Sequence, residues 1–360
     1  MFVRIDNKGN NPLLKAYQNG NFDEFEKLVD DGVNVNCTHP NGLSLIQDIL
    51  KNRMLFDIEH NDKFLNKILK SNVHLGLLGV SDMPLNTCIK LHSHKNMKKI
   101  LKYGIDVNSY GETIYHDSFQ KRNPPIFIAI EYAFLREIKI ILKMKPDLKL
   151  LSCCNETVLN FLIKKNKSSK VGTIMSLLMK NGADPRQKNS IGSSLLHTMA
   201  MTIDKKELFD IVFNENVDIN AIDNDGCTPL MNSVHFGNIE TMMILLDRQA
   251  DVNMRTKSGM TSVMIAVLDG DFEKFKILVK HGADLSIKDN DGNNASYYLA
   301  INNNTLFFDE FLNFFENYPN LLDEKNNAGL SAFNVMDCNG VGQHCSVVKM
   351  SKLIRDSMKS

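Results

Sequence analysis

Residues 223–230 read DNDGCTPL, and the segments that follow repeat the same pattern. The pattern returns as SGMT at residues 258–261 and opens a third time with DG at residues 291–292. The glycine of each copy therefore recurs every 33 residues. A fixed period of this length indicates stacked supersecondary units rather than one globular core.

Each copy predicts two short helices. Thr228 can accept a backbone N–H at a helix start and Pro229 suits the first helical position, so a helix should begin at 228 or 229. Gly237 ends this helix in a tight turn, and a second helix follows with ILL at residues 244–246 on its apolar side. Neither helix is long enough to be stable alone, so each copy must stack on the next.

The period and the Thr-Pro-Leu start at residues 228–230 resemble the ankyrin repeat. The resemblance implies an all-α repeat fold, a solenoid of stacked helix-turn-helix units with short hairpin or loop fingers, as a single domain over residues 1–360. Alignment of other segments on Gly226 predicts ten repeats, with turns near residues 9, 42, 81, 122, 155, 192, 226, 259, 292 and 329. The clearest repeats are 6–36 and 223–292, and residues 329–360 are expected to form the C-terminal capping unit.

The residue type at the position of Thr228 supports the weaker repeats. Across the ten repeats this position holds Asn11, Ser44, Met83, Pro124, Thr157, Ser194, Thr228, Thr261, Asn294 and Ser331. Most of these are Ser, Thr or Asn, whose side chains cap helix N-termini. His197 is the close match to the histidine of the family's Thr-Pro-Leu-His motif. Met231 stands there in the central repeat, which implies more apolar packing at that point.

Two segments depart from the regular repeat. Residues 109–122 form an oversized connection in which aromatic and polar residues alternate, which predicts a hairpin finger projecting from the stack. The ninth repeat contains LFFDEFLNFF at residues 306–315, and these rings are expected to pack in the core rather than to line a ligand pocket.

The composition limits the classes of partner. Lys and Arg together number 42, and so do Asp and Glu. Without a basic excess, binding to nucleic acid or to an anionic membrane is not expected. The seven cysteines are an odd number without disulfide-like spacing, which favours a reducing compartment. No apolar stretch reaches the length of a signal peptide or a membrane span, so we expect a cytoplasmic protein.

The sequence contains no strong catalytic motif: Walker, G-x-G-x-x-G, H-E-x-x-H and G-x-S-x-G patterns are missing. The segment 338–345, CNGVGQHC, could supply thiolates and an imidazole to a metal or a Cys/His nucleophile pair, but a fourth ligand is not evident nearby. His92 and His94 could also bind a metal, yet they fall in the turn between two helices, where a structural role is expected. Cys153 and Cys154 are expected to be small buried side chains. We therefore predict no enzyme, no cofactor and no metal.

The family's partner-contacting surface is typically concave and consists of hairpin tips and the exposed side of each first helix. The resemblance implies a partner-binding set of Asn224, Asp225, Cys227, His235, Phe236, Arg255, Lys257, Ser258, Met260, Leu268, Asp269, Asn290, Asp291 and Asn293. Phe236, Met260 and Leu268 would serve as apolar anchors within a polar rim if they are exposed. The alternative is that these three side chains pack on neighbouring helices.

The predicted function is that of a non-catalytic protein–protein interaction module, a monomer whose concave face binds a partner protein. Two alternatives remain open. One is a microbial or viral effector or antitoxin-like inhibitor that blocks a specific target, for which delivery into a host cell is the alternative localisation. The other is a metal- or Cys/His-dependent enzyme that uses the 338–345 loop.

Overall fold

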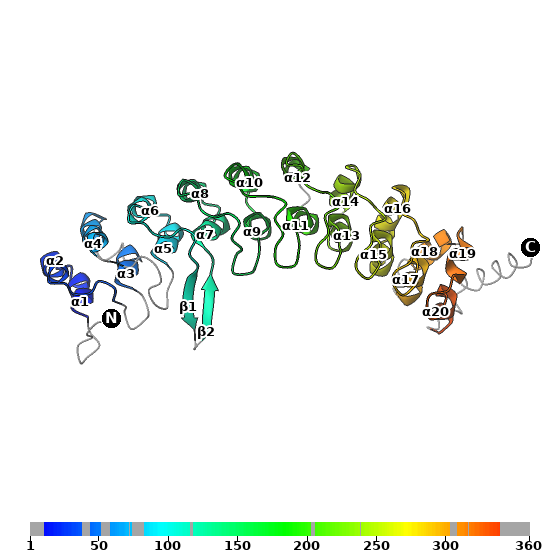
Figure 1. Ribbon diagram of the computed structural model, residues 1–360, viewed down its shortest axis with the longest axis horizontal. Helices are drawn as coiled ribbons and strands as arrows, with labels where there is room; N and C mark the ends of the chain where they lie inside the picture. The colour runs from blue at the N-terminus through cyan, green and yellow to red at the C-terminus, as the bar shows by residue number, and fades with distance from the viewer. Residues whose placement is uncertain are drawn as a thin grey trace, which may run out of the picture. The chain divides into compact units, whose positions relative to one another are not determined.

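The computed structural model describes residues 11–37, 44–51, 58–71, 73, 83–115, 118–202, 206–237, 239–302, 308–315 and 317–338 (Figure 1). The predicted turns at 9, 42 and 81 lie outside these residues, and so does the capping unit after residue 338. The chain divides into two compact parts, Met1–Asp184 and Pro185–Ser360. We call them the N-terminal and C-terminal halves.

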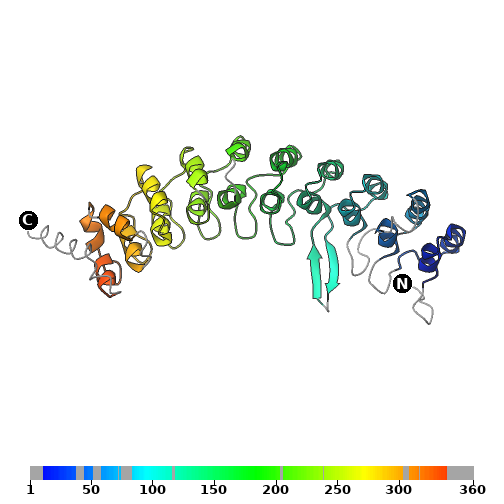
Figure 2. The same cartoon turned by 180° about the vertical axis from the view of Figure 1, so that it is seen from behind.

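The N-terminal half is a stack of antiparallel helix pairs. The pairs are α1 (Pro12–Gln18) with α2 (Phe22–Asp30), α3 (Leu45–Lys51) with α4 (Ile58–Lys70), α5 (Pro84–Lys90) with α6 (His94–Leu101), α7 (Pro125–Glu131) with α8 (Leu135–Leu142), and α9 (Val158–Lys165) with α10 (Val171–Lys180). First helices pack on one another, α3 on α5, α5 on α7 and α7 on α9. Figures 1 and 2 show the pairs of this half side by side in chain order.

The C-terminal half repeats this arrangement. Its pairs are α11 (Leu195–Thr202) with α12 (Lys206–Phe213), α13 (Pro229–His235) with α14 (Ile239–Leu246), α15 (Ser262–Asp269) with α16 (Phe272–Lys280), and α17 (Ala295–Ile301) with α18 (Phe308–Phe315), followed by α19 (Pro319–Asp323) and α20 (Ala332–Cys338). The first helices again pack in sequence, from α11 through α13 and α15 to α17, and α17 packs on α20. The all-α repeat prediction is confirmed, and α19 is an additional helix that the sequence did not predict.

Side-chain caps explain where the first helices begin. α13 starts at Pro229, as predicted, because Thr228 Oγ1 accepts the Met231 N–H at 3.3 Å. In α9 the N-cap Thr157 accepts the Asn160 N–H at 3.2 Å. The caps of α17 and α1 are asparagines that accept first-turn N–H groups in the same way. The polar residues at this register position therefore set the start of successive helices.

Left-handed residues form the turns between repeats. Gly192, Gly226, Gly259, Gly292 and Gly329 have φ angles between +76° and +87°, which favours glycine because a side chain would be strained there. These are five of the predicted turn positions. Asn155, at another, also has a positive φ of 58°. Arg122 differs, because it is the last residue of a strand.

The hairpin finger predicted for residues 109–122 is present. Strand β1 (Gly111–Tyr115) pairs antiparallel with β2 (Ser118–Arg122), with Gly111 opposite Arg122 and Tyr115 opposite Ser118. At its base, the Tyr110 hydroxyl donates a 2.6 Å hydrogen bond to the carbonyl of Leu151 in the next repeat. The finger leaves the helix pairs of the N-terminal half, as Figure 1 shows between α5 and α7.

Aromatic rings fill the core of the C-terminal half near its last helix pairs. The Phe275 ring lies 5.0 Å from Phe311 and 4.9 Å from Phe314, centroid to centroid. Phe275, Phe311 and Phe315 are almost completely buried. The prediction that the aromatic segment of the ninth repeat packs in the core is confirmed for these residues.

His197 shows what the family's histidine does in this fold. Its Nδ1 lies 2.8 Å from Ser194 Oγ and its Nε2 lies 3.0 Å from the carbonyl oxygen of Cys227, in the following repeat. Met231 has the same position one repeat later, and its sulfur accepts the Thr228 N–H at 3.5 Å. A thioether has no proton to donate to the next repeat. The change therefore keeps the local cap and gives up the imidazole's link between repeats.

Candidate functional site

The tips of the turns between repeats are joined by backbone hydrogen bonds in the C-terminal half. The donors and acceptors are Asn224 N to Ile191 O (3.0 Å), Lys257 N to Asp225 O, Asn290 N to Ser258 O and Asn327 N to Asp291 O (each 2.9 Å). We call this series the tip ladder. It fixes the spacing of the tips, and it holds the side chains that flank them in a constant register.

Asparagine side chains reinforce the tip ladder. Asn224 Nδ2 donates to Ser190 O at 3.1 Å, and Asn290 Nδ2 donates to Lys257 O at 2.7 Å. Both asparagines belong to the predicted partner-binding set. Their side chains are exposed, but each spends an amide donor within the stack.

Two further members of the predicted set stabilise the turns. Arg255 Nε donates to Gly259 O at 3.2 Å, and its Nη2 lies 3.4 Å from Asn290 Oδ1. Asn293 is buried, with Nδ2 bonded to Asp289 at 3.0 Å and Oδ1 accepting from Asn326 at 2.8 Å. These contacts account for both polar side chains without a partner protein.

The other predicted tip residues differ in exposure. Cys227 and Met260 are half-buried, and the exposed members are Asp225, Lys257, Ser258 and Asp291. Burial raises the pKa of the Cys227 thiol to about 11, and nearby Asp223 and Asp225 add to the shift. Since the thiolate is the nucleophile and metal ligand, Cys227 is poorly suited to either role.

The C-terminal ends of the first helices carry exposed apolar side chains. Phe236 follows α13 and is 59% exposed, and Leu268 near the end of α15 is 40% exposed. His235 Nδ1 lies 2.8 Å from Asp269 Oδ2, so these neighbouring side chains tie one repeat to the next. His235 and Phe236 also pack edge to face, with 4.2 Å between ring centroids. All four belong to the predicted set, and all four are exposed.

Ile301 extends this row and was missed by the sequence reasoning. It ends α17, is 47% exposed and stands 33 residues after Leu268. The repeat period was the signal that could have found it, because the same step leads from His235 to Leu268. Beside it, Asn302 Nδ2 donates to Leu268 O at 2.6 Å, which again links neighbouring repeats.

The other candidates from the sequence are distributed differently. The 339–345 part of the Cys/His segment lies outside the described residues. Cys153 and Cys154 are exposed, so the expectation that they are buried was wrong. The reason is local: they sit on a turn, where the Cys153 N–H donates to Asn123 Oδ1 at 2.7 Å and the thiols stay outside the core.

His92 and His94 lie at the turn before α6 and at its first residue, as predicted. Both face Glu137 on α8. The sequence reasoning did not connect Glu137 with them, because it is more than 40 positions away in the chain. It is the packing of one repeat on the next that brings the three together.

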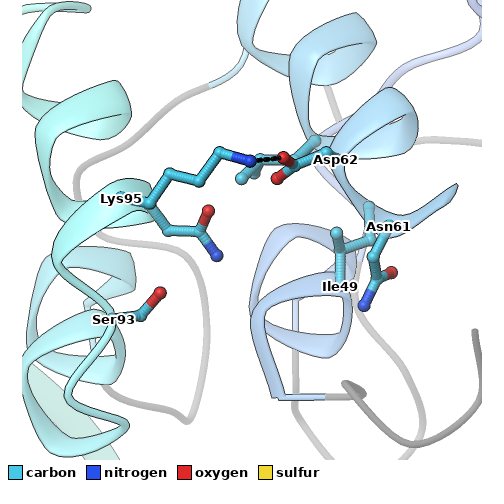
Figure 3. Close-up of a pocket in the computed structure, with 7 residues that line it drawn as sticks. Ile49, Asn61, Asp62, Ser93 and Lys95 are labelled. Atoms are coloured by element: carbon cyan, nitrogen blue, oxygen red, sulfur yellow. Dashed lines mark hydrogen bonds and ion pairs between the residues drawn. The ribbon is translucent and has the colours of Figure 1, made fainter. Parts of the chain in front are cut away.

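A small pocket lies between α3, α4 and α6 in the N-terminal half (Figure 3). Its volume is about 220 Å³, and its lining residues are Ile49, Asn61, Asp62, Leu65, Ser93, Lys95 and Asn96. Lys95 and Lys99 both pair with Asp62; burial raises the pKa of this carboxyl, but hydrogen bonds from the two lysines bring it below its ordinary value. The pocket is smaller than the 300 Å³ or so at which ligand sites usually begin.

Among the described residues, no helix combines the length and the apolar character needed to cross a membrane. A family model described as ankyrin repeats (3 copies) matches residues 167–256 and 196–289. The chain is 25% identical over 136 residues to a putative ankyrin repeat protein of Acanthamoeba polyphaga mimivirus. This match covers 32% of the chain and 38% of that relative, so the chain spans well under half of the relative's length.

The crystal structure of the ankyrin repeat domain of Bcl-3, described as a unique member of the IkappaB protein family, has a similar fold. It matches with a TM-score of 0.51 and 18% sequence identity, over 63% of this chain and 97% of that chain. Helix pairs, left-handed turns and Thr-Pro caps at the family's spacing agree with both comparisons. This chain belongs to the ankyrin repeat proteins.

Proposed function

We propose that this chain binds a partner protein through a surface of the C-terminal half that we call the recognition surface. It consists of the exposed tip residues Asp225, Lys257, Ser258 and Asp291 and the helix-end residues His235, Phe236, Leu268, Asp269 and Ile301. Ankyrin repeat domains are generally protein-binding modules and are typically non-catalytic. Which residues of this chain make the contact is our proposal.

The observation that carries the proposal is the row of exposed apolar side chains at the ends of α13, α15 and α17. Phe236, Leu268 and Ile301 occur in consecutive repeats and are each at least 40% exposed. Burying one such side chain against a partner contributes about 1.5–3 kcal/mol. Aromatic anchors inside a rim of charged groups are characteristic of binding hot spots.

The polar neighbours supply the rim. His235 pairs with Asp269, and Lys257 and Asp225 lie at the tips of adjacent repeats, so both signs of charge surround the apolar row. Mixed charge favours selection of a complementary protein surface over general attraction to a polyanion. The tip ladder holds these groups in place before binding, which lowers the entropy lost on association.

The test is capture of the native partner by three purified forms of the full chain. The wild type is compared with a Phe236→Ala/Leu268→Ala variant and with Tyr103→Ala as control. Tyr103 is an exposed aromatic residue of the N-terminal half, 46% exposed and outside the recognition surface.

We expect a protein that is retained by the wild type and by Tyr103→Ala and is lost or weakened at least about tenfold with the double variant, as for loss of a 1.4 kcal/mol contact. Equal affinity of the wild type and the double variant for that protein would place the contact elsewhere, first at the 109–122 finger.

The similarity to a mimivirus protein is one observation in favour of the narrower alternative, an effector that blocks its target. The captured partner decides this point. If adding the chain inhibits the partner's own activity, and the double variant does not, the chain acts as a blocker. If the partner keeps its activity when bound, the chain acts as a scaffold.

A further inference from the structure

Three potential metal ligands from consecutive repeats converge in the N-terminal half, away from the recognition surface. His92 lies in the turn between α5 and α6, His94 is the first residue of α6, and Glu137 is the third residue of α8. Glu137 Oε1 lies 2.6 Å from His92 Nδ1 and 2.9 Å from His94 Nε2. One ligand atom from each residue can be chosen so that all lie within 4.8 Å of one another.

Glu137 is the unusual member of this group. Its side chain has no exposed surface, and within the part of the chain that the structure describes neither carboxylate oxygen has a partner with hydrogen-bond geometry. His94 Nε2 is likewise buried without one. The imidazole nitrogens approach Glu137 closely, yet not along hydrogen-bond directions. Burying a charge is unfavourable unless an opposite charge or a metal compensates it.

The same position in a later repeat shows the ordinary solution. Lys274 is the third residue of α16, as Glu137 is of α8, and it also reaches back to the turn of the preceding repeat. Its ammonium group donates to the carbonyls of Val234 at 2.6 Å and Gly237 at 3.1 Å. A carboxylate cannot donate to carbonyls, so Glu137 needs a different partner, and what the preceding turn offers it is two imidazoles.

We propose that His92, His94 and Glu137 bind a divalent transition-metal ion, with Zn²⁺ as the best match. Zn²⁺ accepts imidazole nitrogen and carboxylate oxygen at about 2.0–2.2 Å, and two histidines with one glutamate form a known three-ligand set for it. The fourth position of such a site stays open to water or to a group from another molecule. His92 remains 54% exposed at its side chain, so this position is accessible from solvent.

The backbone at His92 supports a role for its side chain. His92 has a φ of 55°, in the left-handed region, where the clearer repeats have Gly20 with 69° and Gly270 with 72°. Histidine tolerates this region less well than glycine, and strain of this kind gathers at functional sites. The left-handed turn is what places the imidazole over Glu137.

Aromatic packing orients the first ligand. The Phe134 ring lies 4.6 Å from the His92 ring, and Tyr132 stacks on Phe134 at 5.4 Å. His92 and His94 are themselves 4.6 Å apart, ring to ring. An apolar wall beside a metal site limits water access and strengthens the attraction between the ion and its carboxylate. The bound ion would fasten the third repeat to the fourth.

The test uses the full chain, stripped with a chelator and kept reduced, titrated with Co²⁺ and then Zn²⁺. We expect one equivalent of Co²⁺ to produce visible absorption bands that Zn²⁺ displaces. Glu137→Gln, His94→Gln and His92→Gly should each weaken Zn²⁺ binding by more than about tenfold, since even residues that only support a ligand contribute 10–100-fold. The glycine variant suits the left-handed backbone, and circular dichroism verifies that each variant is folded.

Two controls separate this site from other ligands. His235→Gln removes an exposed histidine–carboxylate pair of 2.8 Å that contains a single imidazole. Cys153→Ser/Cys154→Ser removes the exposed thiol pair. Both should keep the full equivalent of metal. The proposal is overturned if the wild type binds Zn²⁺ no more tightly than folded Glu137→Gln and His94→Gln, or if the cysteine variant loses the metal.

Discussion

Gly226 shows how much a single residue can depend on the neighbouring repeat. Its φ is +81°, and a Cβ added there would lie 2.7 Å from the backbone nitrogen of Lys257. That nitrogen donates to Asp225 O in the tip ladder. Gly282 also has a left-handed backbone, with φ +89°, but a Cβ there would meet nothing within 4 Å. The two glycines thus separate backbone strain from contact with the next repeat.

We expect Gly282→Ala to lower the free energy of unfolding by roughly 1–2 kcal/mol, the strain of a left-handed alanine. Gly226→Ala should cost at least about 1 kcal/mol more, because it also displaces a hydrogen-bonded neighbour. Urea denaturation of both variants measures the difference. Equal losses would mean that the tip ladder adds nothing to stability.

His197 provides a pH-dependent contribution. Burial lowers the pKa of His197 below its ordinary 6.5, despite the contact with the Cys227 carbonyl, which acts in the opposite direction. The unfolded chain therefore binds more protons than the folded chain once the pH falls below about 6.5, and stability decreases with falling pH. The limiting slope for one group is about 1.4 kcal/mol per pH unit.

His197→Met, which copies the residue found one repeat later, should remove this contribution. Stability of wild type and variant is compared by denaturation at pH 7.5 and at pH 5.5. The wild type should lose more stability over this interval than His197→Met does. A constant difference between them would show that His197 takes up its proton equally in both states.

Helix faces explain which aromatic residues hold the stack and which are available to a partner. Phe275 on α16 is completely buried between α16 and α18, whereas Phe236 after α13 is 59% exposed. Both are phenylalanines within the same half of the chain. Their energetic roles should be opposite.

Phe275→Ala should reduce the free energy of unfolding by about 3–5 kcal/mol, because it leaves a cavity among the rings around it. Phe236→Ala should change it by no more than about 0.5 kcal/mol, as for most surface substitutions. Thermal and urea denaturation test both. A large loss for Phe236→Ala would mean that this ring supports the fold and would weaken the binding test built on it.

On the scale of the whole molecule, contacts between helices join neighbours along the chain in each half. Stability in such an architecture is close to a sum of repeat terms and nearest-neighbour terms. Phe25 in the N-terminal half, whose ring lies 4.8 Å from Phe64, and Phe275 in the C-terminal half belong to separate compact parts.

The variant Phe25→Ala/Phe275→Ala should therefore lose the sum of the two single losses, within about 0.5 kcal/mol. If urea unfolding followed by circular dichroism has two phases, each single variant should shift one of them. A coupling above about 1 kcal/mol would indicate one cooperative unit instead.

The repeat period and the helix caps could be predicted because they depend on residues close in sequence, such as Thr228, Pro229 and Gly226. Contacts between repeats could not. The burial of Asn293 follows from its bonds to Asp289 and Asn326, of which the second belongs to the next repeat. Glu137 joined its histidines for the same reason. The longest omission, Ile301, was a matter of not carrying the period one step further.

The tip ladder also bears on how such a chain changes over time. Each rung uses backbone groups that every repeat possesses, so duplicating one 33-residue segment would add a rung without leaving any neighbour unmatched. Longer connections, such as the finger at 111–122, enter away from these rungs and leave them intact. Growth by whole repeats and variation within single connections are thus separate evolutionary routes, and a new binding specificity can arise by either one.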